Sequence, residues 1–416
     1  MVFLDDRRDT WLLADPGSLL RPAVAGAGGE LRAARPTQVR TDSAGRTLVR
    51  YATTVRWSDG QERTETFGAV SAPNGALPGG LVVVGDDDGR QVGVWRYPYD
   101  PFLPGLAHVA TPDAAGRLLS RMDVPAVNVG VRPLVYRPGT RAVLQVTVGG
   151  ASLYVKVRRP ARSARVRDLH QKAADLVPVP RTAAWSDDLG IQVMEALPGR
   201  TLARVLVDGG AVPPPSALQG LLEGIGQIPA AGRTRDRDAA LRWHAAVIGQ
   251  ALPAIAGRAA RIAAHAGGPL DSAGTAPSQT IHGDFYEAQV LVRDGVVSGL
   301  LDLDDARTGH PVEDWANLIG HLEVLADVRP RAAPRIHAYR DQVEAAASAH
   351  SMPGERSRAV AGVLLGMATV PYFRQEHHWQ ERTRRWLELA QQQLAGPQDE
   401  RALTDLSPSR HSEVRA

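Results

Sequence analysis

The sequence of 416 residues predicts an α+β protein, with antiparallel sheets in the first half of the chain and mainly helices in the second. Up to about residue 198, runs of β-branched and aromatic residues alternate with turns that contain glycine and proline. After Pro198, apolar residues recur at helical spacing and are interrupted by one β segment over 279–303. Apolar residues make up 44% of the chain and charged residues 22%, and this ordinary balance excludes wholesale disorder.

The composition excludes several classes of site and partner. The chain has no cysteine, so a disulfide scaffold, a thiolate zinc site, an iron–sulfur cluster and a cysteine nucleophile are all excluded. It has neither a run of about 18 apolar residues nor an apolar signal core over residues 1–9, so we expect a soluble, cytoplasmic protein without a membrane partner. The net charge is only +3, the basic residues are scattered, and aromatic residues make up 5%, so we expect no nucleic-acid partner. No pattern in the sequence predicts the oligomeric state.

Residues 1–120 are expected to form a β-rich accessory segment with little helix. Two candidate hairpins support this expectation. In the first, strands over 47–57 and 61–70 flank the turn at Asp59 and Gly60. In the second, strands over 81–84 and 91–97 surround three aspartates and a glycine, which are typical of a solvated turn and lack the pattern of a calcium loop.

Residues 121–198 are expected to form a second antiparallel sheet. Five strands are predicted, over 129–136, 142–148, 152–158, 182–185 and 191–195. A helix over 164–176 separates the third strand from the fourth, and Pro178 and Pro180 end it.

Residues 199–396 are expected to be mainly helical, and residues 397–416 are expected to be a mobile, polar tail. Helical spacing predicts helices over 217–225, 239–265, 311–326, 331–350, 355–369 and 378–394. The second of these is long and rich in alanine, and the β segment lies between it and the third.

The β segment carries the clearest chemical signature in the chain. A strand leads into His282, Gly283 and Asp284, a tight loop returns to a strand that starts at Gln289, and a turn reverses the chain into a strand that ends at Asp302. One hairpin thus brings Asp284, Gln289 and Asp302 to the same edge. Two carboxylates and a side-chain carbonyl at one edge favour a bound cation, and hard Mg²⁺ prefers oxygen ligands of this kind.

This order and spacing fit the requirements of phosphoryl transfer from a nucleoside triphosphate. The transferred group needs Mg²⁺ to neutralise its charge, and a further carboxylate must orient the acceptor hydroxyl and take its proton. In protein kinases these roles belong to an aspartate, an asparagine five residues later and an aspartate after the next turn. Gln289 stands five residues after Asp284, with glutamine in place of asparagine.

The motif resembles that of the aminoglycoside phosphotransferase/choline kinase-like family, a phosphotransferase enzyme family whose catalytic loop reads His-Gly-Asp. The segment from Gly309 to Ala316 continues the likeness, which covers about residues 126–395. The resemblance implies a bilobal protein-kinase-like fold, with a small antiparallel β lobe over 121–198 and a large, mainly helical lobe over 199–396. It leaves the first 120 residues as an extra β-rich segment, expected to buttress the small lobe.

The resemblance also implies roles for individual residues. Asp284 is expected to be the catalytic base, and His282 is expected to support its loop. Gln289, Asp302 and Asp304 are the candidate ligands of Mg²⁺. The acceptor is expected to be a hydroxyl of a small molecule, with a sugar, a polyol, an amino alcohol and an aminoglycoside all left open.

On the small lobe, the likeness predicts the site of the nucleotide, ATP or GTP. Lys156 lies in the middle of a predicted strand and is one of only two lysines among 48 basic residues, and a compact ammonium suits a point contact to phosphate. The turn at Gly139 and Thr140 would then cover the phosphates. Backbone groups near Glu195 and Leu197 would hold the adenine edge.

Two departures from the family pattern keep other functions open. The helix over 164–176 offers no glutamate to pair with Lys156, and Gln289 replaces asparagine, so a non-catalytic nucleotide-binding module is one alternative. A metal-dependent phosphohydrolase built on His282 and the three aspartates is a less favoured alternative. Such sites normally draw on several histidines at fixed helical spacing, which this region lacks.

Overall fold

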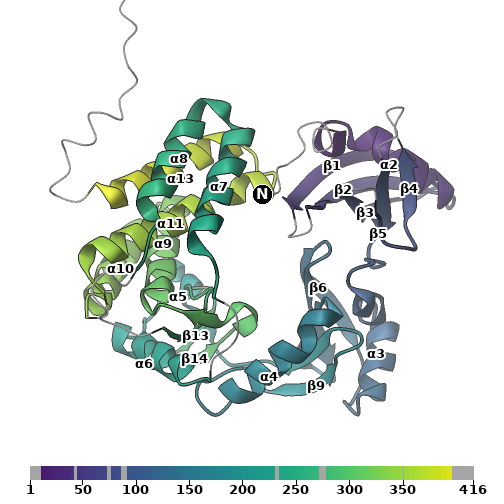
Figure 1. The fold of residues 1–416 in the computed structure, drawn as a ribbon. Helices are drawn as coiled ribbons and strands as arrows, with labels where there is room; N and C mark the ends of the chain where they lie inside the picture. The colour runs from purple at the N-terminus through teal and green to yellow at the C-terminus, as the bar shows by residue number, and fades with distance from the viewer. Residues whose placement is uncertain are drawn as a thin grey trace, which may run out of the picture.

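The computed structural model describes residues 11–41, 45–72, 76–85, 91–229, 234–270, 278–349 and 351–395. Two five-stranded antiparallel sheets are followed by a mainly helical part that contains two small sheets. Figure 1 shows the first sheet in purple, the second in blue and the helical part in green and yellow. The expected α+β architecture, with a β-rich segment ahead of a sheet lobe and a helical lobe, is confirmed.

The first sheet contains both predicted hairpins and one strand that the sequence pattern did not predict. Its order is β1-β2-β3-β5-β4. The strands are β1 (Gly29–Thr41), β2 (Thr47–Trp57), β3 (Glu62–Ser71), β4 (Val82–Gly85) and β5 (Gln91–Arg96). The strand β1 was missed because its side chains are mostly half-exposed and polar, so it lacks apolar alternation. The three aspartates near residue 87 lie outside the described residues.

Two helices correct the expectation of little helix in the first 120 residues. The helix α2 (Pro16–Gly26) begins at the carboxylate of Asp15, which accepts a hydrogen bond from the N–H of Ser18 at 3.0 Å. Its apolar side packs with β1 and β2 in one buried cluster. The helix α3 (Pro112–Arg121) precedes the second sheet and packs beneath it.

The second sheet agrees with the predicted strands. Its order is β6-β7-β8-β10-β9, with all neighbours antiparallel. The elements are β6 (Gly130–Arg137), β7 (Arg141–Val148), β8 (Ala151–Arg158), α4 (Ser163–Ala173), β9 (Thr182–Ser186) and β10 (Ile191–Glu195). Val155 and Val157 pack into the core below the sheet. Because successive side chains of a strand point to opposite faces, Lys156 lies on the other face, toward the helical part.

The helical part has one continuous apolar core. Its helices are α5 (Leu202–Asp208), α6 (Pro215–Gly226), α7 (Arg237–Ala251), α8 (Ala256–Ala266), α9 (Val312–Val328), α10 (Ala333–Ala347), α11 (Pro353–Met367), α12 (Val370–Phe373) and α13 (Trp379–Leu394). The single helix predicted over 239–265 is wrong, because the chain breaks at Pro253 into α7, a 3₁₀ turn and α8. Proline has no N–H to donate and disfavours helical geometry in the residue before it. The short helix α5 was not predicted.

Short strands hold the two motif loops in place. The strand β12 (Gln279–Ile281) pairs with β15 (Arg307–Gly309), and β13 (Val290–Arg293) pairs with both β14 (Val296–Leu300) and β11 (Arg200–Thr201). The loop with His282 and Asp284 therefore follows one small sheet, and the loop with Asp302 follows the other. None of the described helices is both long enough and apolar enough to cross a membrane. The predicted tail over 397–416 lies outside the described residues.

Candidate active site

The loop that follows β12 is held at its start by hydrogen bonds. Asp314, in the first turn of α9 and 2% exposed, accepts hydrogen bonds from the backbone N–H groups of His282 and Gly283 at 2.7 and 2.8 Å. The Nε2 atom of His282 lies 2.9 Å from the carbonyl oxygen of Leu301. Gly283 has a φ of +76°, and a Cβ there would lie 2.5 Å from the backbone carbonyl oxygen of Asp305. Only glycine fits this position, so the loop presents Asp284 in one defined place.

Asp284 and Asp302 lie close enough to influence each other. Burial, together with the charge of Asp302, raises the pKa of Asp284 to about 6. Burial alone would also raise the pKa of Asp302, but the charges of Lys156 and Arg141 outweigh it and hold this pKa well below the ordinary value. The two carboxylates thus differ: Asp302 stays ionised, whereas Asp284 takes up a proton near pH 6.

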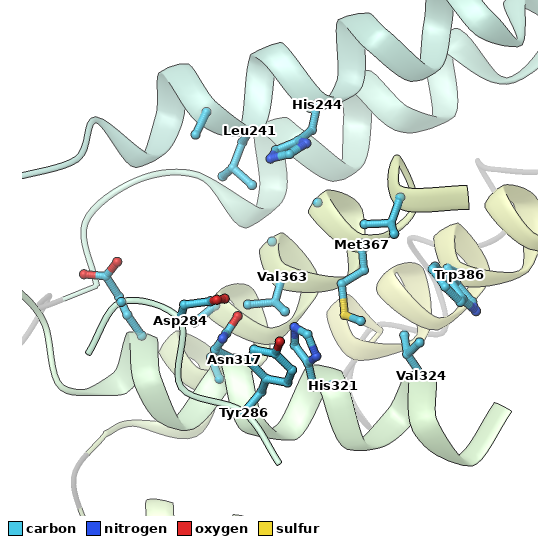
Figure 2. A pocket seen from close by; sticks show the side chains of 18 of the residues that line it. Leu241, His244, Asp284, Tyr286, Asn317, His321, Val324, Val363, Met367 and Trp386 are labelled. Atoms are coloured by element: carbon cyan, nitrogen blue, oxygen red, sulfur yellow. The ribbon is translucent and has the colours of Figure 1, made fainter. Parts of the chain in front are cut away.

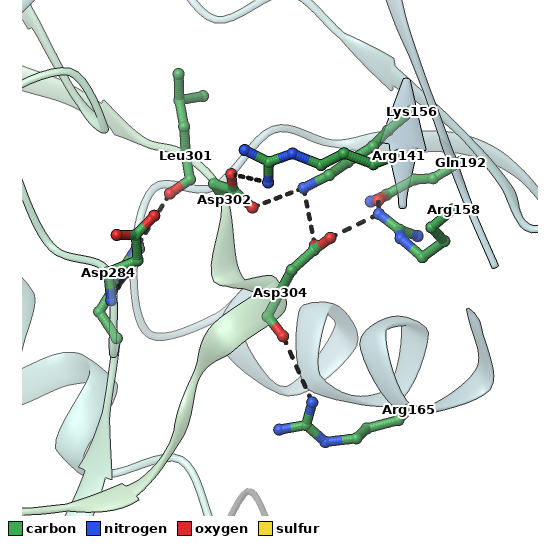
Figure 3. A network of polar contacts seen from close by, with 10 residues as sticks. Arg141, Lys156, Arg158, Arg165, Gln192, Asp284, Leu301, Asp302 and Asp304 are labelled. Carbon is green, nitrogen blue, oxygen red and sulfur yellow. Dashed lines mark hydrogen bonds and ion pairs between the residues drawn. The ribbon is translucent and has the colours of Figure 1, made fainter. Parts of the chain in front are cut away.

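Lys156 bridges the two carboxylates of the Asp302 loop. Its Nζ lies 2.7 Å from Oδ1 of Asp302 and 2.9 Å from Oδ1 of Asp304, and its side chain is only 7% exposed. Arg141 contacts the other oxygen of Asp302 at 2.7 Å, and Arg158 lies 3.4 Å from Asp304 (Figure 3). The glutamate missing from α4 is therefore replaced, because aspartates of the opposite lobe hold the lysine.

The sequence reasoning missed Arg141 and Arg158, although a local signal marks one of them. Arg158 stands two residues after Lys156 on β8 and so belongs to the same face of the strand. Arg141 begins the neighbouring strand β7 and pairs with Arg158 across the ladder. Alternation on two adjacent strands would have predicted this row of cations.

Gln289 lies beside the Asp302 loop and is 6% exposed. Its backbone carbonyl accepts a hydrogen bond of 2.8 Å from the N–H of Leu301, the residue before Asp302. Glu287, two residues earlier, was missed by the sequence reasoning. It is buried, its Oε2 has no hydrogen-bond partner among the described residues, and burial raises its pKa to about 7.

The predicted phosphate turn is occupied by contacts within the protein. The N–H of Gly139 donates to Asp100 at 2.8 Å, and the N–H of Thr140 donates to the carbonyl of Arg137 at 3.0 Å. The Thr140 hydroxyl accepts from Arg40 of β1, so the first sheet reaches this turn. Thr140 lines the cavity on the sheet side, and both amide groups of the turn already donate to partners within the protein.

The predicted adenine-binding segment lies at the end of β10. The carboxylate of Glu195 forms an ion pair with Arg181. The backbone N–H of Glu195 donates to the backbone carbonyl of Arg181 at 2.9 Å. Leu197 is half-buried and packs against Gly299. A Cβ added at Gly299 would lie 2.5 Å from a methyl carbon of Leu197. Neither Glu195 nor Leu197 lines the two cavities described next.

Two cavities meet at Asp284. The first, of about 510 Å³, lies on the sheet side and is lined by Arg40, Thr140, Arg141, Arg158 and Asp304 among others. The second, of about 680 Å³, lies among α7, α9, α11 and α13 (Figure 2). Both are lined by Gly283, Asp284 and three arginines, namely Arg137, Arg235 and Arg307. The carboxylate therefore stands between a cation-rich space and a space inside the helical part.

Two histidines in the second cavity are held neutral. Burial lowers the pKa of His321 to about 3 and that of His244 to about 4, and nearby arginines add to the effect. His321 stacks on Tyr286 with ring centroids 4.2 Å apart, and the positive charge of Arg374 lowers its pKa further. The Nδ1 of His244 lies 3.4 Å from the hydroxyl oxygen of Thr369, and the positive charge of Arg235 lowers the pKa of His244 further.

These shifts predict that the protein loses stability in acid. A histidine whose folded pKa lies below its unfolded value of about 6.5 stabilises the fold fully above that value, and this contribution is lost as the pH falls toward the folded pKa. Each histidine should add up to about 1.4 kcal/mol per pH unit to the slope of the unfolding free energy between about pH 6 and about pH 4. Urea unfolding at a series of pH values measures this slope. The unfolding free energy should depend less steeply on pH in His321→Gln and in His244→Gln than in the wild type. An unchanged slope in both variants would contradict the prediction.

The profile of the phosphotransferase enzyme family (APH) matches residues 136–350, more than half of the chain. Solved structures that are similar to the chain include three phosphotransferases. A thermostable mutant of aminoglycoside phosphotransferase APH(4)-Ia, in ternary complex with ADP and hygromycin B, is 14% identical over 65% of this chain and 97% of that chain, with a TM-score of 0.46.

The other two similar structures are also distant. Macrolide 2'-phosphotransferase MphH from Brachybacterium faecium is 19% identical over 66% of this chain and 98% of that chain, with a TM-score of 0.43. The GDP complex of wild-type aminoglycoside 2'-phosphotransferase-IIIa is 15% identical over 67% of this chain and 97% of that chain, with a TM-score of 0.44. No curated protein matches the chain. The family profile carries the assignment: the chain belongs to the phosphotransferase enzyme family.

Proposed function

We propose that the protein transfers the γ-phosphoryl group of ATP or GTP to a hydroxyl of a small molecule. The observation that carries this proposal is the position of Asp284 between a cation-rich cavity and a second cavity in the helical part. A nucleoside triphosphate suits the first cavity because arginines from five strands line it. An acceptor in the second cavity would meet the terminal phosphate of the nucleotide at the carboxylate of Asp284.

Asp284 is the group that takes the proton of the acceptor hydroxyl. General-base catalysis requires a carboxylate that is ionised at neutral pH and within reach of the hydroxyl. A pKa of about 6 meets the first requirement and leaves a stronger base than an ordinary aspartate. His282 does not touch the reacting atoms in this scheme. It positions the loop through Asp314 and Leu301.

The metal ligands are proposed to be Asp302 and Gln289, with Asp304 beside them. The donor set fits Mg²⁺, which commonly takes one or two protein carboxylates and completes its shell with phosphate oxygens. Bound Mg²⁺ would neutralise charge on the phosphates. Within the described ranges, no group of three or more His, Cys, Asp or Glu residues could hold a metal by itself.

Lys156 and the upstream loops would contact the nucleotide itself. Lys156 lies on the face of β8 toward Asp302, so its ammonium can exchange a carboxylate for a phosphate oxygen with little movement. Thr140 lines the same cavity and would contact a phosphate through its hydroxyl, next to Gly139. Backbone groups near Glu195 and Leu197 remain the proposed contacts of the base.

We propose three parts of the chain with the following boundaries. Residues 121–198 would form the small lobe and residues 199–396 the large lobe. Residues 1–120 would buttress the small lobe, because Arg50 donates to the carbonyl of Tyr136 at 2.8 Å. The Tyr136 hydroxyl in turn accepts from Trp95 at 2.8 Å.

The proposal predicts that Mg·ATP or Mg·GTP stabilises the protein. A ligand present at about 100 times its Kd adds about 2.7 kcal/mol to the free energy of unfolding, which appears as a clear rise of Tm. Thermal unfolding would be compared with Mg²⁺ alone and with nucleotide in excess EDTA. The absence of a shift with either nucleotide would contradict the proposal. A shift without phosphorylation of any alcohol in a broad panel would favour the non-catalytic module.

A further inference from the structure

Part of the lining of the second cavity is apolar. Leu241 of α7, Val324 of α9 and Met367 of α11 line it, and the ring of Trp386 of α13 closes the end opposite Asp284 (Figure 2). The indole N–H of Trp386 donates to Asp327 at 3.0 Å, so the polar atom of this ring already has a partner. With about 680 Å³, the space holds a molecule of drug-like size.

The charges of this cavity oppose a polycationic acceptor. Its described lining contains seven arginines and three carboxylates. Apart from Asp284, both carboxylates are already paired: Glu313 contacts Arg307 at 2.6 Å, and Glu376 contacts Arg382. Several ammonium groups would therefore meet like charges and would find no unpaired carboxylate beyond the catalytic one.

The histidines of the cavity add hydrogen-bonding groups without adding charge. His244 and His321 are half-buried, and loss of solvation lowers the pKa of each far enough that both are neutral at pH 7. A neutral imidazole offers one donor and one acceptor, which suits hydroxyl, ether or carbonyl groups on the body of a ligand. Asn317 and Tyr286 lie nearer to Asp284 and offer further polar atoms at the mouth.

We propose that the acceptor is an alcohol with a sizeable apolar body and no cluster of cationic groups. Its hydroxyl would lie at Asp284, and its apolar part would extend between α9 and α11 toward Trp386. This inference rests on the proposed phosphotransfer and narrows its acceptor. It disfavours both the aminoglycoside and the simple sugar left open by the sequence.

A matched pair of probes tests the apolar body. Methyl β-D-glucoside and octyl β-D-glucoside, the latter below its micellar concentration, carry the same hydroxyls and differ in chain length only. In calorimetric titrations the octyl compound should bind at least about tenfold more tightly, because each buried methylene favours binding. Hygromycin B, a polycation, should bind no better than the methyl glucoside. Equal affinities for the two glucosides, or tighter binding of hygromycin B, would overturn the inference.

Two methionine variants locate the binding. Met367→Trp fills the cavity and should remove the preference for the octyl chain, whereas Met352→Trp, at a side chain 53% exposed ahead of α11, should retain it. A preference that survives Met367→Trp would place the octyl chain elsewhere and would overturn the inference. Turnover with Mg·ATP is measured separately. Phosphorylation without the octyl preference would refute this inference alone, and the preference without any phosphorylation would refute the proposed phosphotransfer.

Discussion

Replacing Asp284 by asparagine is expected to lower the rate of phosphoryl transfer by a factor of about 10²–10⁴, the usual contribution of a general base. The amide has nearly the same shape as the carboxylate but cannot take a proton at neutral pH. Asp314 holds the loop through the N–H groups of His282 and Gly283, so the loop should keep its conformation in this variant. Steady-state phosphorylation of an acceptor measures the loss, and the thermal shift with Mg·ATP should persist.

A second aspartate provides the control for this experiment. Asp294 lies in the turn between β13 and β14, its side chain is 91% exposed, and it lines neither cavity. Asp294→Asn should leave the activity unchanged, because asparagine also tolerates the left-handed conformation at this position, where φ is +52°. Full activity in Asp284→Asn would refute the assignment of the base. Loss of both activity and thermal shift would show that the substitution has disturbed the fold of the loop.

The arrangement of the loop that carries Asp284 could be predicted from the sequence because its geometry is local. Asp302 stands only 18 positions after Asp284, and two short strands with one turn between them fix how these residues meet. The same holds for Lys156, whose place in the middle of a strand follows from apolar neighbours on either side. Patterns of this kind depend on backbone periodicity, and the periodicity survives in the fold.

The partners of these residues could not be predicted, because they come from distant parts of the chain. The contact between Lys156 and Asp302 spans 146 positions, and no local pattern records which lobe faces which. Arg40 was missed for the same reason, since it reaches Thr140 from a strand whose sequence shows no alternation. Both cavities form between helices and strands of different segments, so their lining depends on the packing of the whole fold.

Replacing Lys156 by alanine is expected to weaken both the fold and the binding of Mg·ATP. The substitution leaves Asp302 and Asp304 together at one buried site, with only Arg141 and Arg158 to compensate. Removal of one partner from a buried ion pair costs about 3–5 kcal/mol when the remaining charge is left unpaired. Because Arg141 and Arg158 still pair with the two aspartates, the loss of unfolding free energy here should lie below that range. Urea unfolding measures this loss, and calorimetry measures the weaker affinity for Mg·ATP.

The only other lysine of the chain provides a matched control. Lys172 pairs with Asp168 at 2.8 Å on one turn of α4, and both side chains are largely exposed to solvent. Exposed pairs at this helical spacing contribute only about 0.3–0.5 kcal/mol, so Lys172→Ala should change neither stability nor nucleotide affinity appreciably. Equal losses in the two variants would contradict the buried contact of Lys156 with the aspartates. If Lys156→Ala is destabilised but binds Mg·ATP as tightly as the wild type, then Lys156 only joins the lobes. The phosphates would in that case rest on the arginines of the sheet-side cavity.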